Sequence, residues 1–326
     1  MSVLRNCSYT LPLTMHYAPH PTLEQLACLR DALAPAAKVE VERRIKGGLG
    51  CTTDVLRVAE PGRAPARMIL RRYDSWYAEN KPRAAEIEFA VLKHLKKHGV
   101  PAPEPVWVDR QATFETPAMV IGFISGEVQK HPKDPMDYAS QLAKMLARLH
   151  DVPRAGLPAD LTDYNAAEVA VLSASEPPDT MKAHRLGSLL WECQRRERGR
   201  VELDTGGFLH GDYWPGNTLW RGQKLAAVLD FEEVGVGDPA LDVAIAAVNL
   251  RLEPWPEASD HFVSVYRAET GRALETLRFW EMKELRRPMP DIANWLPSFQ
   301  HFHARADVTA DELRAEHERL IREALG

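Results

Sequence analysis

The segment from Phe208 to Ala247 constrains this 326-residue chain more than any other part of it. Apolar runs alternate there with loops rich in Gly, Pro, Asp and Asn. The loop from His210 to Asn217 reads HGDYWPGN, and the apolar run Leu225 to Leu229 ends at Asp230. Glycine and proline mark turns between these pieces. The chain therefore reverses direction between Asn217 and Asp230, which would bring their side chains together.

The spacing of these polar residues resembles the catalytic core of eukaryotic-like kinases, where H-x-D-x-x-x-x-N is followed by an Asp after the next strand. The His-Gly-Asp form, followed by Gly-Asp-Pro-x-x-Asp at Gly237 to Asp242, is similar to the aminoglycoside phosphotransferase family. That family also includes choline, homoserine and fructosamine kinases. The resemblance covers residues 40 to 250 and implies a protein-kinase-like fold.

The resemblance implies a role for each polar residue of this segment. Asp212 would accept or orient the proton of the attacking hydroxyl, since phosphoryl transfer needs positioning and charge neutralisation. Asn217 and Asp230 would bind Mg²⁺, a hard cation that takes oxygen ligands. The supporting residues would be His210, which braces the loop, Glu232, which assists the metal, and Asp238 and Asp242, which anchor the catalytic loop and the next helix.

Weaker signals for a nucleotide site lie upstream. The glycines from Gly47 to Gly50 join two expected strands, so Gly48 and Gly50 could close over phosphates, although an ordinary glycine-containing hairpin is the alternative. The segment is not a Walker A loop, because Gly50 is not followed by Lys-Ser or Lys-Thr. The third strand offers Arg71 where the family normally has Lys. Arginine keeps the positive charge of lysine but binds phosphate oxygens with a different geometry. The sequence therefore does not decide whether the nucleotide is ATP or GTP.

Two further elements complete the expected nucleotide side. Glu88 matches the family position that pairs with the strand cation, with Glu86 as the alternative. The apolar strand from Met119 to Phe123 would form the wall of the adenine site, and backbone groups of Ile121 and Phe123 would bond the base.

The periodicity of the remaining chain predicts an α+β, bilobal arrangement. Three strands, from Lys38, over Val55 to Ala59 and over Arg67 to Arg72, are expected to form an antiparallel meander. The expected helices cover Thr22 to Leu33, Pro82 to His98, Tyr138 to His150, Asp179 to Arg198 and most of His261 to Leu325. We expect a small antiparallel sheet lobe with one main helix over 1–125, including a helical extension over 1–37. A larger, mostly helical lobe over 126–326 would carry catalysis and the acceptor.

Composition excludes several other classes of protein. The net charge of −5 gives no basic surplus for nucleic acid, and no run of 18 apolar residues predicts a membrane span. Four cysteines without zinc spacing indicate reduced thiols and a cytoplasmic protein. Residues 201–260 contain 11 acidic and 3 basic side chains, and this local balance of −8 favours a cationic acceptor.

These observations together predict an ATP- and Mg²⁺-dependent O-phosphotransferase that acts on a hydroxyl of a small molecule, most like an aminoglycoside phosphotransferase. The alternatives are a choline, ethanolamine, homoserine or sugar kinase, a macrolide phosphotransferase, and a non-catalytic nucleotide-binding relative. A protein kinase is disfavoured, because the short spacing to Gly237 leaves no room for an activation loop. The sequence does not determine the acceptor, the number of metal ions or the oligomeric state.

Overall fold

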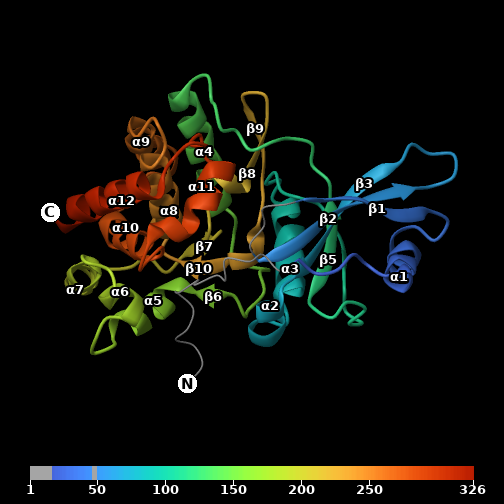
Figure 1. The fold of residues 1–326 in the computed structure, drawn as a ribbon, viewed down its shortest axis with the longest axis horizontal. Coiled ribbons are helices and arrows are strands. Elements are labelled where there is room, and N and C mark those ends of the chain that lie inside the picture. The colour runs from blue at the N-terminus through green and yellow to red at the C-terminus, as the bar shows by residue number, and fades with distance from the viewer. Residues whose placement is uncertain (1–16, 46–49) are drawn as a thin grey trace.

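The computed structural model describes residues 17–45 and 50–326. A five-stranded antiparallel sheet with its helices precedes Ser125, and the chain after it is mostly helical (Figure 1). The α+β class predicted from the sequence is therefore confirmed.

The sheet has the strand order β1-β2-β3-β5-β4, and every neighbouring pair is antiparallel. Its strands are β1 (Lys38–Ile45), β2 (Cys51–Ala59), β3 (Ala66–Tyr73), β4 (Pro105–Val108) and β5 (Ala118–Gly122). The first three form the predicted meander. Because β3 is central, Arg71 lies opposite Thr53 on one side and Met119 on the other.

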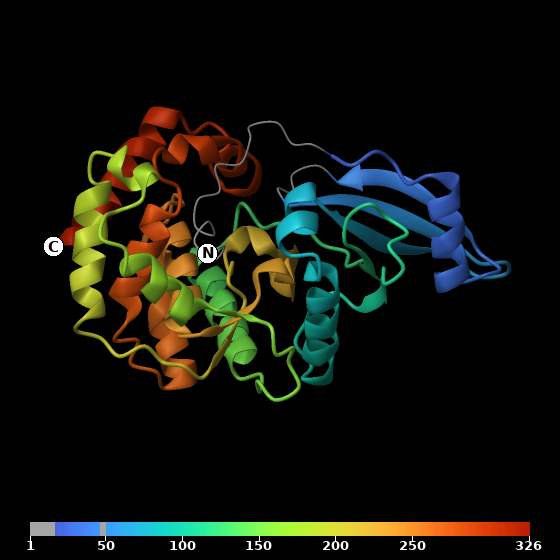
Figure 2. The same cartoon turned by 90° about the horizontal axis from the view of Figure 1, so that it is seen from below.

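Helices cover both faces of this sheet (Figure 2). The helix α1 (Leu23–Leu33) begins at a capping box made by Thr22 and Gln25. It contributes Leu29 to a small core with Leu56 and Leu70. The opposite face packs against α3 (Ala84–Lys97), whose apolar side is buried. The short helix α2 (Ser75–Asn80), capped by Asp74, links the sheet to α3.

The C-terminal part surrounds one fully buried helix. Every residue of α8 from Ala240 to Leu250 is buried, as expected for a helix that is apolar on all sides. The other helices of this part are α4 (Pro135–His150), α5 (Tyr164–Leu172), α6 (Asp179–Lys182), α7 (Gly187–Arg198), α9 (Glu257–Thr270), α10 (Leu277–Arg286), α11 (Leu296–Phe302) and α12 (Ala310–Leu325).

Two small sheets lie where the two parts of the molecule meet. They are formed by β6 (Thr162–Asp163), β7 (Gly207–Leu209) and β10 (Gly235–Gly237), and by the hairpin of β8 (Thr218–Arg221) and β9 (Lys224–Val228). The hairpin joins the large sheet region through a hydrogen bond of 2.9 Å from Val228 N to Pro101 O. The catalytic segment predicted from the sequence therefore lies at this junction (Figure 1).

One helix prediction is wrong. The segment from Asp179 to Arg198 was expected to be one helix, but α6 ends at Lys182 and α7 begins at Gly187. A Cβ atom at Gly187 would lie 2.2 Å from the carbonyl oxygen of Met181, so the chain folds back on itself there. This close backbone contact is a tertiary feature that helical periodicity does not reveal. The periodic pattern also missed α2 and α5, which are short.

A buried histidine in α12 predicts how stability responds to acid. His317 is 2% exposed, and its Nε2 lies 2.6 Å from the carbonyl oxygen of Leu285. Burial lowers the pKa of His317 from 6.5 to about 4. The unfolded chain therefore binds this proton first as the pH falls. The folded state therefore has its full stability with respect to His317 above pH 6.5. As the pH falls from 6.5 to about 4, protonation of the unfolded chain lowers the free energy of unfolding by up to about 3 kcal/mol.

The His317→Gln variant keeps an N–H donor for Leu285 but does not titrate. We expect its unfolding free energy, measured with urea at several pH values, to fall less steeply between pH 6.5 and 4 than that of the parent protein. The exposed His301 provides the control, since His301→Gln should leave the slope unchanged. Identical slopes in the His317 variant and the parent would contradict this explanation.

Candidate active site

The loop that follows β7 is held by an aspartate of the buried helix α8. Asp242 accepts hydrogen bonds from the backbone N–H groups of His210 at 2.7 Å and Gly211 at 2.9 Å. Its Oδ2 also lies 3.0 Å from Nε2 of His150. A buried carboxylate with several N–H partners fixes the backbone that it contacts. Asp242 therefore has the geometry of the loop anchor that was predicted.

Asp238 and His210 also contact backbone. Asp238 accepts hydrogen bonds from Ala240 N at 2.9 Å and from Asp204 N at 3.3 Å. Nδ1 of His210 accepts from Asp212 N at 3.3 Å, and its Nε2 lies 2.8 Å from the carbonyl oxygen of Leu229. His210 thus links the loop to the end of β9. This bracing contact is the geometry expected from the sequence.

Gly211 permits the turn that presents Asp212. Its φ is +81°, a region that favours glycine, and a Cβ atom there would lie 2.0 Å from the carbonyl oxygen of Glu233. Any larger residue would displace the loop from the chain after β9. The glycine of the His-Gly-Asp motif therefore has a packing reason as well as a conformational one.

Both carboxylate oxygens of Asp212 have partners. Oδ2 accepts from Nδ2 of Asn217 at 3.0 Å, and the same amide donates to the Asp212 carbonyl at 2.9 Å. Oδ1 forms an ion pair at 2.8 Å with Nη1 of Arg287, the residue after α10. The sequence analysis missed Arg287, because it lies 75 residues from Asp212 and belongs to no recognised motif.

Asp230 is brought beside Asn217 by the β8–β9 hairpin. The hydrogen bond from Leu229 N to Asn217 O is 2.8 Å long. Asp230 itself adopts a left-handed backbone conformation, with φ 64° and ψ 63°. Strained conformations of non-glycine residues concentrate at functional sites. The amide of Asn217 uses its N–H groups on Asp212, so its oxygen remains the donor atom for a cation.

The oxygen atoms of Asn217 and Asp230 fit a magnesium ion better than a transition metal. Mg²⁺ is usually held by one or two protein carboxylates together with phosphates and water. In the part of the chain that the structure describes, no group of three or more His, Cys, Asp or Glu side chains is arranged to bind a metal. This donor chemistry suits an ion that arrives with a nucleotide.

Arg71 connects the large sheet to the candidate catalytic segment. Its Nη1 is 2.8 Å from Oε1 of Glu88, which is the ion pair expected from the sequence. The alternative partner, Glu86, instead lies 3.4 Å from Arg83. Nη2 of Arg71 is 2.6 Å from Asp230 Oδ1 and 2.9 Å from Glu232 Oε2. The guanidinium thus bridges carboxylates from both parts of the molecule, a use of its fork geometry that lysine cannot reproduce.

Two acids beside Arg71, Glu88 and Glu232, are largely withdrawn from solvent, whereas the Asp230 side chain is 37% exposed. Burial raises the pKa of Glu88, and burial followed by the charge of Asp230 raises the pKa of Glu232 well above its ordinary value. Cys51, which sequence reasoning did not single out, donates its thiol to Oε2 of Glu232 at 3.2 Å. Burial raises the pKa of Cys51 as well, so this thiol is protonated and serves as a donor.

The remaining nucleotide-side residues are placed unequally. Gly48 lies outside the described residues. Gly50 approaches the acids so closely that a Cβ atom there would lie 2.6 Å from Glu232 Oε1. Ile121 lies inside the sheet, opposite Ile69 and Pro105, whereas Phe123 follows the end of β5. The contacts of these backbone groups with a nucleotide base remain predictions.

Four aromatic residues from α10 to the end of α11 divide into two groups. Trp280 and Phe299 are fully buried and pack between helices. Trp295 is half-buried and lies under the Arg287 guanidinium, 5.4 Å from the ring centroid. Phe302 makes an edge contact with Trp214, which lies two residues after Asp212. Packing is therefore the role of the first pair, and the second pair lies near Asp212.

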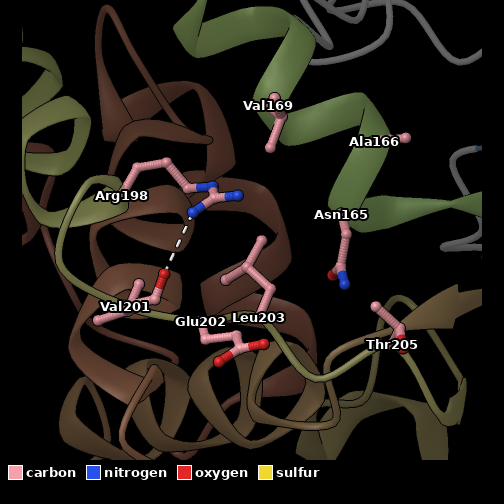
Figure 3. Close-up of a pocket in the computed structure, with 8 residues that line it drawn as sticks. All are labelled: Asn165, Ala166, Val169, Arg198, Val201, Glu202, Leu203 and Thr205. Atoms are coloured by element: carbon pink, nitrogen blue, oxygen red, sulfur yellow. Dashed lines mark hydrogen bonds between the residues drawn. The ribbon is translucent and has the colours of Figure 1, made fainter.

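A separate cavity of about 360 Å³ opens between α5 and the segment after α7 (Figure 3). Figure 3 shows Asn165, Ala166 and Val169 on one side and Arg198 to Thr205 on the other. None of the predicted site residues lines it. The cavity is therefore distinct from the cluster around Asp212.

The family follows from comparison with known proteins. The model of the phosphotransferase enzyme family (APH) matches residues 44–280, which is most of the chain. The chain belongs to this family, and the resemblance inferred from the motifs is confirmed. Among the described residues, no helix combines the length and the apolarity that crossing a bilayer requires.

Individual relatives differ in the acceptor that their names state. The homoserine kinase of Afipia carboxidovorans is 28% identical over 203 residues, and the match covers 59% of this chain. The chain spans only 59% of that relative's length. An aminoglycoside 3′-phosphotransferase of Streptomyces fradiae is 28% identical over 229 residues, which is 63% of this chain and 83% of the relative.

Solved structures show the same fold. Aminoglycoside phosphotransferase APH(4)-Ia, solved as a thermostable mutant in a ternary complex with ADP and hygromycin B, superimposes with a TM-score of 0.60. The likeness covers 94% of this chain and 100% of that one at 13% identity. At this identity the likeness establishes the fold, and the predicted protein-kinase-like class is confirmed.

Proposed function

We propose that this protein transfers the γ-phosphoryl group of Mg²⁺-ATP to a hydroxyl group of a small molecule. The observation that carries the proposal is one continuous line of contacts. It runs from Arg71 to Asp230, across the hairpin to Asn217, and from Asn217 to Asp212. This line joins a phosphate-binding cation, two metal-binding oxygens and a carboxylate base, the parts that phosphoryl transfer needs.

Each residue then has a role at a stated atom. Asp212 takes the proton of the acceptor hydroxyl as the hydroxyl oxygen bonds to the γ-phosphorus. The bond from that phosphorus to the β–γ bridging oxygen breaks, and the electron pair leaves with ADP. Asn217 and Asp230 would hold Mg²⁺, which neutralises charge on the phosphates. Arg71, oriented by Glu88, would bind the phosphates, and Glu232 would complete the acidic side of this site.

In this proposal the two parts of the chain have different functions. Residues 1–125 form the nucleotide lobe, with Gly50, Ile121 and Phe123 near the nucleotide, and residues 126–326 form the catalytic and acceptor lobe. Arg71 leaves ATP and GTP as alternative donors. The described structure has free thiols at Cys28, Cys51 and Cys193. Free thiols support a location in the reducing cytoplasm.

A direct assay tests the proposal. The purified protein is incubated with Mg²⁺-ATP and, separately, with aminoglycosides, macrolides, choline, L-homoserine and sugars, and acceptor-dependent release of ADP is measured. We expect release with at least one class, and its loss when EDTA removes the metal. Nucleotide binding without any acceptor-dependent release would favour the non-catalytic relative instead.

A further inference from the structure

Arg287 is a cation that directly contacts the proposed base. Its Nη1 lies 2.8 Å from Oδ1 of Asp212, and its guanidinium lies over the ring of Trp295, 5.4 Å from the ring centroid. We propose that Arg287 binds an oxyanion of the acceptor, so that the acceptor carries a carboxylate or phosphate near the hydroxyl that is phosphorylated. The inference rests on the function proposed above and names the substrate class of that site.

Distance is the first argument. A hydroxyl that hydrogen-bonds to Oδ1 of Asp212, the oxygen that Arg287 contacts, lies within two hydrogen-bond lengths, roughly 6 Å, of the Arg287 nitrogen. A group a few bonds from that hydroxyl therefore meets the guanidinium. Arginine has five N–H donors in a planar fork that matches carboxylate and phosphate oxygens, so it can bind such a group beside Asp212.

The second argument is that the local charge is not what the composition suggests. Most acids of residues 201–260 already have partners in the described structure. Cations pair with five of them: Arg272 with Asp204, Arg287 with Asp212, Arg71 with Asp230 and Glu232, and Lys81 with Glu233. Asp242 and Glu253 instead contact His150 and His303, whose rings carry charge only when protonated. The balance of −8 therefore does not by itself support a cationic acceptor, which would also meet the like charge of Arg287.

A structural role is the competing explanation, because cations near a helix C-terminus stabilise it through the helix dipole. Arg287 directly follows α10 and also lies 3.4 Å from Glu284 of that helix. A purely structural Arg287 would change stability without changing which acceptors are used. The test therefore compares acceptors of different charge in the same variants.

The experiment uses acceptors that differ in charge. L-Homoserine is compared with 3-aminopropan-1-ol, and D-glycerate and glycerol 3-phosphate with glycerol; choline and kanamycin serve as cations. We expect the parent protein to prefer the oxyanion-bearing member of each set. In Arg287→Gln, KM for that member should rise about 10- to 100-fold, while KM for ATP stays the same. Comparing KM for D-glycerate with KM for glycerol 3-phosphate shows whether the site recognises a carboxylate or a phosphate.

Two matched variants control this result. Arg287→Lys keeps the charge and should recover part of the preference. Arg278 lies on α10, the helix that Arg287 follows, but it contacts the carbonyl oxygen of Ala324 near the end of α12, so Arg278→Gln should behave like the parent protein.

Several outcomes would overturn the inference while leaving the proposed function intact. They are a preference for choline or kanamycin, an equal loss with every acceptor in Arg287→Gln, and a rise in KM for ATP, which would assign Arg287 to the transferred phosphate. If no acceptor is turned over, the proposed function fails.

Calorimetric titration of D-glycerate, with Mg²⁺ and a non-hydrolysable ATP analogue, then tests the binding site separately. Binding to the parent protein that is lost in Arg287→Gln supports the site, and no binding to the parent protein refutes it.

Discussion

Replacing Asp212 with alanine should lower acceptor-dependent ADP release by about 10²- to 10⁴-fold, the contribution typical of a positioned general base. The Asp212 side chain is 20% exposed, and Asp242 holds the loop backbone independently of it through the N–H groups of His210 and Gly211. The variant should therefore remain folded. Its affinity for Mg²⁺-ATP, measured by calorimetry, should persist.

An asparagine at the same position separates chemistry from structure. Asp212→Asn can still bond to Asn217 and Arg287 but cannot take a proton, so it should be as inactive as the alanine variant. Asp260, exposed on α9, provides a matched control, and Asp260→Ala should retain full turnover. Normal turnover in Asp212→Asn would show that the carboxylate only positions its neighbours.

Replacing Asp230 with asparagine should weaken metal-dependent nucleotide binding. Substitution of a residue that supports a metal ligand typically lowers metal affinity or activity about 10- to 100-fold. Loss of a direct anionic ligand should therefore lower turnover by at least about 100-fold. The ion pair of Arg71 with Glu88 remains in this variant and keeps the guanidinium in place. The affinity for ATP is measured with Mg²⁺ and with EDTA, and the difference between the two should largely disappear.

Glu233 offers a control within the same short turn. Its carboxylate contacts Lys81 and Tyr77, whereas Asp230 contacts Arg71. Glu233→Gln should therefore retain the effect of Mg²⁺ on nucleotide affinity. An unchanged metal effect in Asp230→Asn would show that Asp230 is not a ligand and that its ion pair with Arg71 is its main role.

The elements that were correctly predicted have strong local signals. The helix α1 has Thr22 as a capping residue and apolar residues on one stripe, and α3 ends before Gly99, whose φ is +67°. The antiparallel order of the first three strands follows from short connections between them. The prediction of a single helix from Asp179 to Arg198 was wrong, because the contact of Gly187 with Met181 depends on tertiary folding.

The candidate site was predictable where its residues belong to one short motif. Asp212, Asn217 and Asp230 lie within 19 residues, and the hairpin between them is encoded locally. The pair of Arg71 and Glu88 was predictable because a strand and the helix after it carry it. The contacts of Arg71 with Asp230 and Glu232 were not, since 159 and 161 residues separate these partners.

The sequence by itself determined the family and the α+β architecture and pointed to the candidate catalytic segment, because each depends on local periodicity or on a compact motif. Only the tertiary structure decided how the charges are used. It pairs Arg287 with Asp212 and distributes most of the acids of residues 201–260 among cations and backbone N–H groups. The physical reason is that electrostatic energy depends on distance and burial, and packing between distant segments determines both.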